Sequence, residues 1–164
     1  MMGNLSVTTA VQNYVFFWHK WCALSLEYEC DFEVHGICFK NVIQYILFSK
    51  AKIYNDNEVA EKIIKTGELS EMTSLSSLIR GVNKQDWSTR ILSVATSGCK
   101  MKLAQNSDIW EALQSTKGKI LAFTNPEEKF WGIGMKPLDY RAVNQNEWDG
   151  KNHLGNIFME LRDN

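Results

Sequence analysis

Apolar residues recur at helical spacing along most of the chain, and this pattern predicts a mainly helical protein. The stretch 39–52 is apolar on nearly every side, which is typical of a helix enclosed by its domain, and Asn41 is its expected N-cap. A single apolar face predicts further helices, which we expect over 56–67, 86–105, 107–118 and 152–164. For 70–81 we expect a loop with a short helical piece.

A few short strands accompany these helices. Apolar residues alternate over 31–39 around His35 and Gly36, which predicts a hairpin. Residues 119–123 and 129–135 read as two strands that flank a turn at Asn125 and Pro126. We therefore predict an α+β fold, mainly helical with a small sheet, in which a lead-in over 1–13 precedes one domain over 14–164.

Size and charge narrow the possible functions. A chain of 164 residues with 45% hydrophobic residues supports one well-packed core. Its net charge of −1 provides no general attraction to nucleic acid or to membranes, so a polyanion would need a local site. The N-terminal region has no uninterrupted apolar stretch, because His19 and Lys20 follow a short apolar run. We expect a soluble protein in the cytoplasm, with no membrane partner.

The four cysteines do not have the spacing of a metal site. Cys22, Cys30 and Cys38 are separated by eight residues each, and Cys99 lies far along the chain. No pair has the short gap of a zinc site, and the histidines do not supply matching ligands. We expect reduced, mostly buried thiols, no metal and no cofactor.

The segment 127–135 is the most unusual in composition. Trp131 lies beside Gly132 and Gly134, so a flat ring stands next to backbone without side chains. Such an arrangement suits the stacking of a planar base close to a sugar or phosphate. On these residues alone, a core tryptophan beside a β-bulge explains the pattern as well.

Several motifs in this order resemble one family. They are FEVHGICF, YILFSKAK, DNEVAEKI, LIRG followed by DW, MKLAQN, FWGIG and WDGKNHLGNIFMELR. They resemble the NADAR family of YbiA-like N-glycosidases over about residues 16–162. The resemblance implies an α+β domain that binds a ribosylated base and hydrolyses its N-glycosidic bond, in flavin precursors or in the ADP-ribosylated guanine made by DarT-type toxins.

This resemblance implies a set of ligand-binding residues. Trp87 and Trp131 would bracket the base along a cleft bordered by helix 39–52, and Arg80 and Lys50 would lie near phosphate. At the start of the last helix, Asn156 would lie near free backbone donors for an anion. The full expected set is Asn41, Gln44, Lys50, Arg80, Trp87, Trp131, Gly132, Gly134, Asn152, Gly155 and Asn156.

The catalytic acids implied by the family are missing. Ile43 stands where the family has a glutamate, two residues before Tyr45, and Phe123 stands at a frequent acidic position. Cleavage of the glycosidic bond passes through an oxocarbenium-like state that needs a carboxylate. No catalytic residue is therefore assigned, although Glu27, Glu29 or Glu128 would be the candidates if the acid had moved to another wall.

Two functions remain open. The first is a degenerate NADAR domain that neutralises a DNA ADP-ribosylating toxin by binding the toxin or its ADP-ribosylated DNA or nucleotide, as a phage anti-defence protein would in the host cytoplasm. The second is an active N-glycosidase that removes ADP-ribose from guanine or cleaves a ribosylated metabolite. A purely structural module is a third possibility, favoured only by the aromatic run at 14–21.

Overall fold

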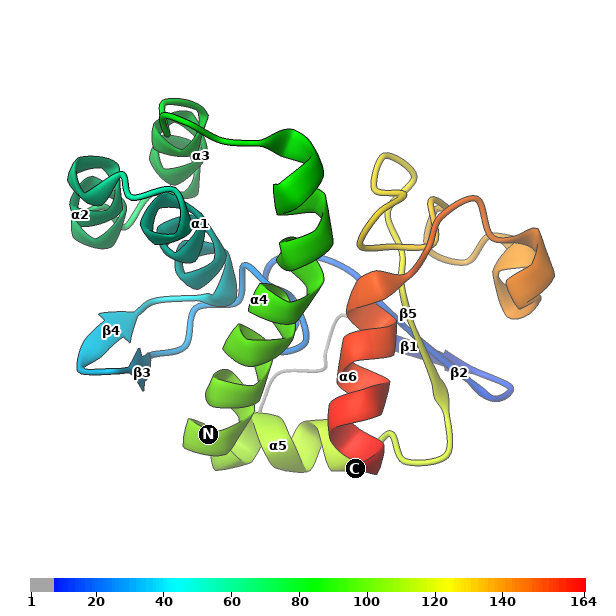
Figure 1. Cartoon of the computed structure of the whole chain (residues 1–164). Helices are drawn as coiled ribbons and strands as arrows, with labels where there is room; N and C mark the ends of the chain where they lie inside the picture. The colour runs from blue at the N-terminus through cyan, green and yellow to red at the C-terminus, as the bar shows by residue number, and fades with distance from the viewer. Residues whose placement is uncertain (1–7) are drawn as a thin grey trace. The chain divides into compact units, whose positions relative to one another are not determined.

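The computed structural model describes residues 8–164 (Figure 1), and these form two compact units. One unit combines the chain up to Tyr28 with Ser107–Asn164, and we call it the terminal unit. The other comprises Glu29–Asn106, and we call it the central unit. Both helices and small sheets are present, so the predicted α+β class is confirmed.

The central unit is a group of helices with one hairpin. Its elements are β3 (Phe32–Val34), β4 (Ile37–Phe39), α1 (Val42–Ile53), α2 (Asn57–Lys65), α3 (Leu69–Ser77) and α4 (Lys84–Gln105). The predicted hairpin is confirmed as an antiparallel β3–β4 pair, with left-handed backbone at His35 and Gly36 in its turn. The segment 70–81 was expected to be mostly loop, but α3 covers most of it.

Helix α1 is the centre of this unit, because it contacts α2, α3 and α4. Among its residues only Lys52 is exposed, which confirms the enclosed position predicted from its apolar sides. A glycine in α4 permits the close approach of α1, since a Cβ on Gly98 would lie 2.7 Å from Cδ1 of Tyr45. This contact explains a residue that otherwise weakens a helix.

The terminal unit is built on a three-stranded sheet. Its strands are β1 (Thr8–Val11), β2 (Tyr14–Phe17) and β5 (Ile120–Phe123), in the order β1-β2-β5. The pairing is antiparallel for β1–β2 and parallel for β2–β5. Of the predicted lead-in 1–13, residues 1–7 lie outside the described part of the chain, and the next four residues form β1. They belong to the sheet because they pair with β2 over its whole length.

The remaining elements of the terminal unit are α5 (Ser107–Gln114), two short 3-10 helices η1 (Tyr140–Val143) and η2 (Gln145–Glu147), and α6 (His153–Asp163). The prediction of α5 is confirmed, although the helix ends before Gly118. Helix α6 packs against β5 through buried Leu154, Ile157 and Phe158. At its end, buried Arg162 donates to the carbonyl oxygens of Thr116 and Lys119, each at 2.8 Å.

The predicted strand at 129–135 is wrong. This segment is a loop whose backbone bonds to β5 on one side and to the start of α6 on the other. The N–H of Ile133 donates to the Phe123 carbonyl at 2.8 Å, and the N–H of Asn152 donates to the Gly132 carbonyl at 3.0 Å. Isolated bonds on two different segments replace the continuous ladder that a strand requires.

Asn152 and Gly155 join this loop, β5 and α6. The Asn152 side chain is fully buried, accepts from the N–H of Phe123 at 3.0 Å and donates to the carbonyl of Leu121 at 2.8 Å. Gly155 lies against the same carbonyl, and a Cβ there would come within 2.2 Å of it. These two residues let α6 approach the strand without leaving its backbone groups unpaired.

The structure also shows how far the cysteines are buried and whether any helix could span a membrane. Cys22 and Cys99 are buried, Cys30 is half-buried and Cys38 is exposed. Burial raises the pKa of Cys99 to about 12, so this thiol is an inert core residue. Within residues 8–164, no helix has both the length and the apolar character needed to cross a bilayer.

We predict that Gly155→Ala lowers the free energy of unfolding by about 3 kcal/mol, because the added methyl group overlaps a backbone carbonyl that cannot move aside. Urea denaturation at equilibrium measures this change. Gly67→Ala is the matched control, since no atom lies within 4 Å of the methyl group that it adds. Equal stability of the two variants would contradict the close contact at Gly155.

Candidate functional site

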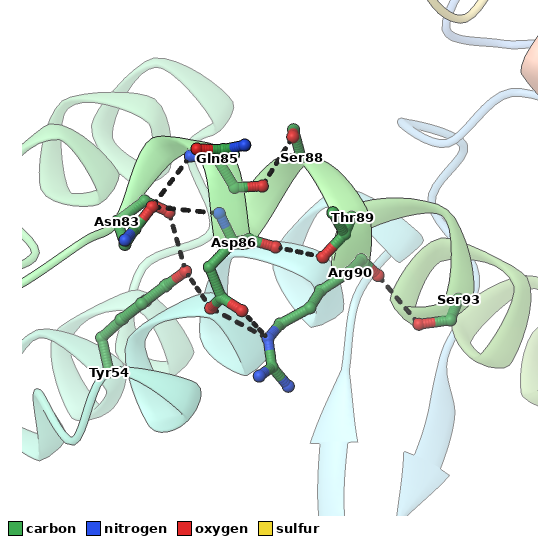
Figure 2. Close-up of polar contacts among 8 residues, drawn as sticks. All are labelled: Tyr54, Asn83, Gln85, Asp86, Ser88, Thr89, Arg90 and Ser93. Atoms are coloured by element: carbon green, nitrogen blue, oxygen red, sulfur yellow. Dashed lines mark hydrogen bonds and ion pairs between the residues drawn. The ribbon is translucent and has the colours of Figure 1, made fainter.

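A polar network ties the end of α1 to the start of α4 in the central unit (Figure 2). The Tyr54 hydroxyl, at the C-cap of α1, donates to the Asp86 carboxylate at 2.8 Å. Arg90 donates from Nε to both oxygens of this carboxylate, at 2.8 and 2.9 Å. Asn83 caps α4, because its side-chain oxygen accepts from the N–H groups of Gln85 and Asp86.

The electrostatics of this network keep Asp86 ionised. Hydrogen bonds from Arg90 and then from Tyr54 lower the pKa of the Asp86 carboxyl. Desolvation and then the hydrogen bond to Asp86 raise the pKa of Tyr54, so the phenol keeps its proton. An ionised carboxylate is a poor proton donor, so Asp86 does not have the environment of a general acid.

Two of the expected ligand residues meet beside this network. The Lys50 ammonium nitrogen lies 5.7 Å from the centre of the Trp87 ring, and both side chains are half-buried. This distance allows a cation–π contact, and burial lowers the pKa of Lys50. A cation and a planar ring therefore lie next to each other in the central unit.

Arg80 has a structural partner, although its side chain is 73% exposed and its expected phosphate contact stays a prediction. Its Nε and Nη2 donate to the two oxygens of Asp56, each at 3.0 Å, and its backbone N–H donates to the same carboxylate. The Asp56 side chain is only 1% exposed, and it also accepts from the N–H of Val59 as the N-cap of α2. Arg80 thus connects the end of α3 to the start of α2.

Asn41 and Gln44 are likewise occupied by the protein itself. Asn41 caps α1, because its oxygen accepts from the N–H of Gln44 at 2.9 Å. The Gln44 amide is buried, accepts from the N–H of Lys40 and donates to the carbonyls of Ile63 and Thr66. Both side chains have structural partners, which explains their shared face on α1 without a ligand.

In the terminal unit, Glu128 supports the loop that carries Trp131. One carboxylate oxygen accepts from the backbone N–H groups of Phe130 and Trp131, each at 3.1 Å. Trp131 is half-buried and packs edge-on against Phe130, with ring centres 4.8 Å apart. Phe130 also contacts the ring of His153, whose pKa is lowered by burial and then by Lys151.

The glycines of this unit lie where backbone segments come close together, and backbone N–H groups are used in hydrogen bonds. A Cβ on Gly132 would lie 2.6 Å from the carbonyl oxygen of Phe123, and Gly134 has a φ of 69°. The first backbone donors of α6 are used, because the N–H groups of His153 and Leu154 donate to the carbonyls of Phe130 and Trp131. The expectation of free donors near exposed Asn156 therefore fails for these two groups, and a binding role for Asn156 stays a prediction.

The other candidates are divided between the two units. Glu27 is half-buried in the terminal unit, and Glu29 is exposed at the start of the central unit. Trp87 belongs to the central unit and Trp131 to the terminal unit, so their predicted common cleft stays a prediction. Within residues 8–164, no group of three His, Cys, Asp or Glu side chains is placed to hold a metal ion.

Sequence reasoning missed the Tyr54–Asp86–Arg90 network. A signal was present, since Asp86 and Arg90 are four residues apart on a helix, the spacing of a favourable ion pair. The contribution of Tyr54 could not be found in this way, because it is 32 residues distant and reaches Asp86 only through packing of α1 on α4.

A family model described as "NADAR domain" matches residues 12–164. The chain belongs to the NADAR family. A mimivirus protein named "N-glycosidase R617" is 29% identical over 120 residues, which are 73% of this chain and 71% of that protein. "Protein irg-1" of Caenorhabditis elegans is 31% identical over 122 residues, and this chain spans only 58% of its length.

The fold agrees with a solved member of the family. The NMR structure of the Escherichia coli protein YbiA superposes with a TM-score of 0.77 at 17% identity, covering 99% of this chain and 90% of YbiA. The motifs that suggested the family therefore lie in a NADAR fold. Ile43 lies on α1 and Phe123 on β5, and both are half-buried.

We predict that Asp56→Asn lowers the stability of this NADAR domain at neutral pH. The hydrogen bond from Arg80 holds the pKa of Asp56 well below its usual value, so its stabilising contribution is present above about pH 4 and is lost as the pH falls. The variant should therefore show a smaller loss of stability on acidification, measured by urea denaturation from neutral to acidic pH.

The control for this series is Asp31→Asn, which removes a carboxylate that is 75% exposed and paired only with Lys40 at the surface. An exposed ion pair contributes little to stability, so this variant should follow the wild-type pH dependence. If Asp56→Asn also followed it, the Asp56–Arg80 ion pair would have no role in acid sensitivity.

Proposed function

We propose that this chain is a non-hydrolytic NADAR domain that neutralises a DNA ADP-ribosylating toxin of the DarT type by binding the toxin or its ADP-ribosylated nucleotide or DNA. The observation that carries the proposal is the hydrocarbon side chain at both family acid positions, Ile43 and Phe123. Neither side chain can transfer a proton or balance the charge of an oxocarbenium-like sugar.

The remaining carboxylates support the same proposal. Glu128, one of the candidates for a relocated acid, accepts from two backbone N–H groups and thereby supports the Trp131 loop. Among residues 8–164, the carboxyl groups whose pKa departs from the usual value all have a lowered pKa; they are Asp56, Glu58, Asp86, Asp139 and Asp163. A general acid for glycoside cleavage needs the opposite shift.

The retained features favour binding. Two rings have neighbouring groups that hold them. The Trp87 ring lies beside Lys50 in the central unit, and Trp131 is on a loop that Glu128 supports in the terminal unit. A ring that is already ordered loses little conformational freedom when a base stacks on it. Binding therefore has support from side chains that are present, whereas hydrolysis lacks its carboxylate.

An active N-glycosidase is the second candidate. The name of the mimivirus relative, an N-glycosidase that is 29% identical, favours this function. In that case the chain would remove ADP-ribose from guanine or cleave a ribosylated metabolite. The carboxylate would come from an element other than α1 or β5. Glu27 and Glu29 are the remaining candidates for this carboxylate.

Titration separates the two functions. We expect protection from a DarT-type toxin only when the protein approaches equimolar amounts, because a binder is consumed by its target. DNA modification by the toxin is measured over a series of protein-to-toxin ratios, with free ADP-ribose assayed in the same samples. Full protection at far lower ratios, together with accumulating ADP-ribose, would show that the chain is an enzyme.

Restoring the acids provides a second test. We predict that Ile43→Glu combined with Phe123→Glu creates or raises release of ADP-ribose from ADP-ribosylated DNA, because a lost carboxylate is worth several kcal/mol of transition-state stabilisation. Ile43→Gln combined with Phe123→Gln is the matched control, with similar size and no charge. Equal release by the two double variants would mean that the acids alone do not account for the missing activity.

A further inference from the structure

The turn after β2 presents an aromatic ring to solvent. Trp21 is 58% exposed, and the imidazole of His19 stacks on it with ring centres 3.8 Å apart and planes at 14°. The Lys20 ammonium nitrogen lies 5.5 Å from the centre of the same ring. An exposed indole, a second ring and a cation are therefore grouped on three consecutive residues, which we call the Trp21 turn.

This turn is held firmly from both sides. Trp18 packs against the core of the terminal unit, and Cys22, Ala23 and Leu24 are fully buried. The N–H of Cys22 donates to the carbonyl of His19 at 3.1 Å and closes the turn. His19 has a φ of 79°, a conformation that is uncommon for residues other than glycine and that costs free energy. The exposed ring is thus displayed by an anchored backbone.

The charge of this region favours an anionic partner. Lys20 is the first charged side chain of the sequence, and no Asp or Glu precedes Glu27. The chain as a whole has a net charge of −1, so this acid-free stretch is a local exception. Phosphate groups are attracted to such a cation, and bases stack on exposed aromatic rings.

We propose that the Trp21 turn is a contact site for single-stranded nucleic acid, in which a base stacks on Trp21 and Lys20 contacts a neighbouring phosphate. Stacking does not depend on which base is present, so the contact has little sequence preference. The inference goes beyond the proposed toxin neutralisation and does not depend on it, because it uses residues that are absent from the expected ligand set.

The test uses the full chain and a fluorescein-labelled oligothymidylate, with binding followed by fluorescence anisotropy at several salt concentrations. Trp21→Ala should weaken binding about 5- to 160-fold, the range for loss of one base–aromatic stack. Lys20→Gln should reduce the slope of log affinity against log salt concentration by about 0.7, as expected for one phosphate contact on a single strand.

Trp110→Ala is the matched control. Trp110 is also an exposed tryptophan of the terminal unit, at 39%, but its neighbours in α5 include Asp108 and Glu111. We expect this variant to bind as the wild type does, and Trp21→Phe to retain most of the affinity. Thermal denaturation of each variant checks that the fold is intact.

Three outcomes would overturn the proposal. They are unchanged binding in Trp21→Ala, equal losses in Trp21→Ala and Trp110→Ala, and absence of salt-dependent binding by the wild type. Vesicles containing phosphatidylserine provide the alternative anionic surface. If Trp21→Ala abolished vesicle binding while oligonucleotide binding was unaffected, the turn would be a membrane contact instead. An oligouridylate should bind like the oligothymidylate, because neither contact involves the sugar.

Discussion

Buried backbone groups must have hydrogen-bond partners, and two carboxamide side chains meet this requirement where regular pairing stops. Asn152 supplies one acceptor and one donor to β5 in the terminal unit. Gln44 does the same for the backbone around α1 and α2 in the central unit. In the described part of the chain, no buried side-chain nitrogen or oxygen lacks a partner, so these amides belong to a complete network.

This requirement explains why several family motifs persist in this chain. Asn152, Gly132 and Gly155 maintain close contacts between backbone segments, and substitution at any of them would disrupt the fold. Ile43 and Phe123 are half-buried, and the Phe123 ring packs against Phe17 with ring centres 5.4 Å apart. A retained motif is therefore evidence for the fold, and activity needs separate evidence from the residues of the site.

The charged residues of the central unit follow the same logic. Asp56 and Asp86 are paired with Arg80 and Arg90, and each pair sits at a helix end where a cap is also needed. These carboxylates are kept ionised by their partners and join helices to one another. Lys50 and Trp87 make no such cap, and their contact is a cation–π pair with the ammonium nitrogen 5.7 Å from the ring centre.

The sequence by itself determined the features that depend on nearby residues. The hairpin at His35 and Gly36, the cap at Asn41 and the enclosed position of α1 follow from local turn and capping chemistry and from apolar periodicity. Prediction from the sequence failed where the hydrogen-bond partners of a segment are distant in the chain. Residues 129–135 have the composition of a strand, but their backbone bonds to β5 and α6 replace a ladder.

Roles of individual polar residues were also decided by the tertiary structure. The amide of Gln44 donates to the carbonyls of Ile63 and Thr66, and Arg80 pairs with Asp56, and neither partner was predicted from the sequence. Hydrogen-bond partners of this kind are not encoded by spacing along the chain. They depend on which segments packing brings within about 3 Å of one another, and only the folded chain contains that information.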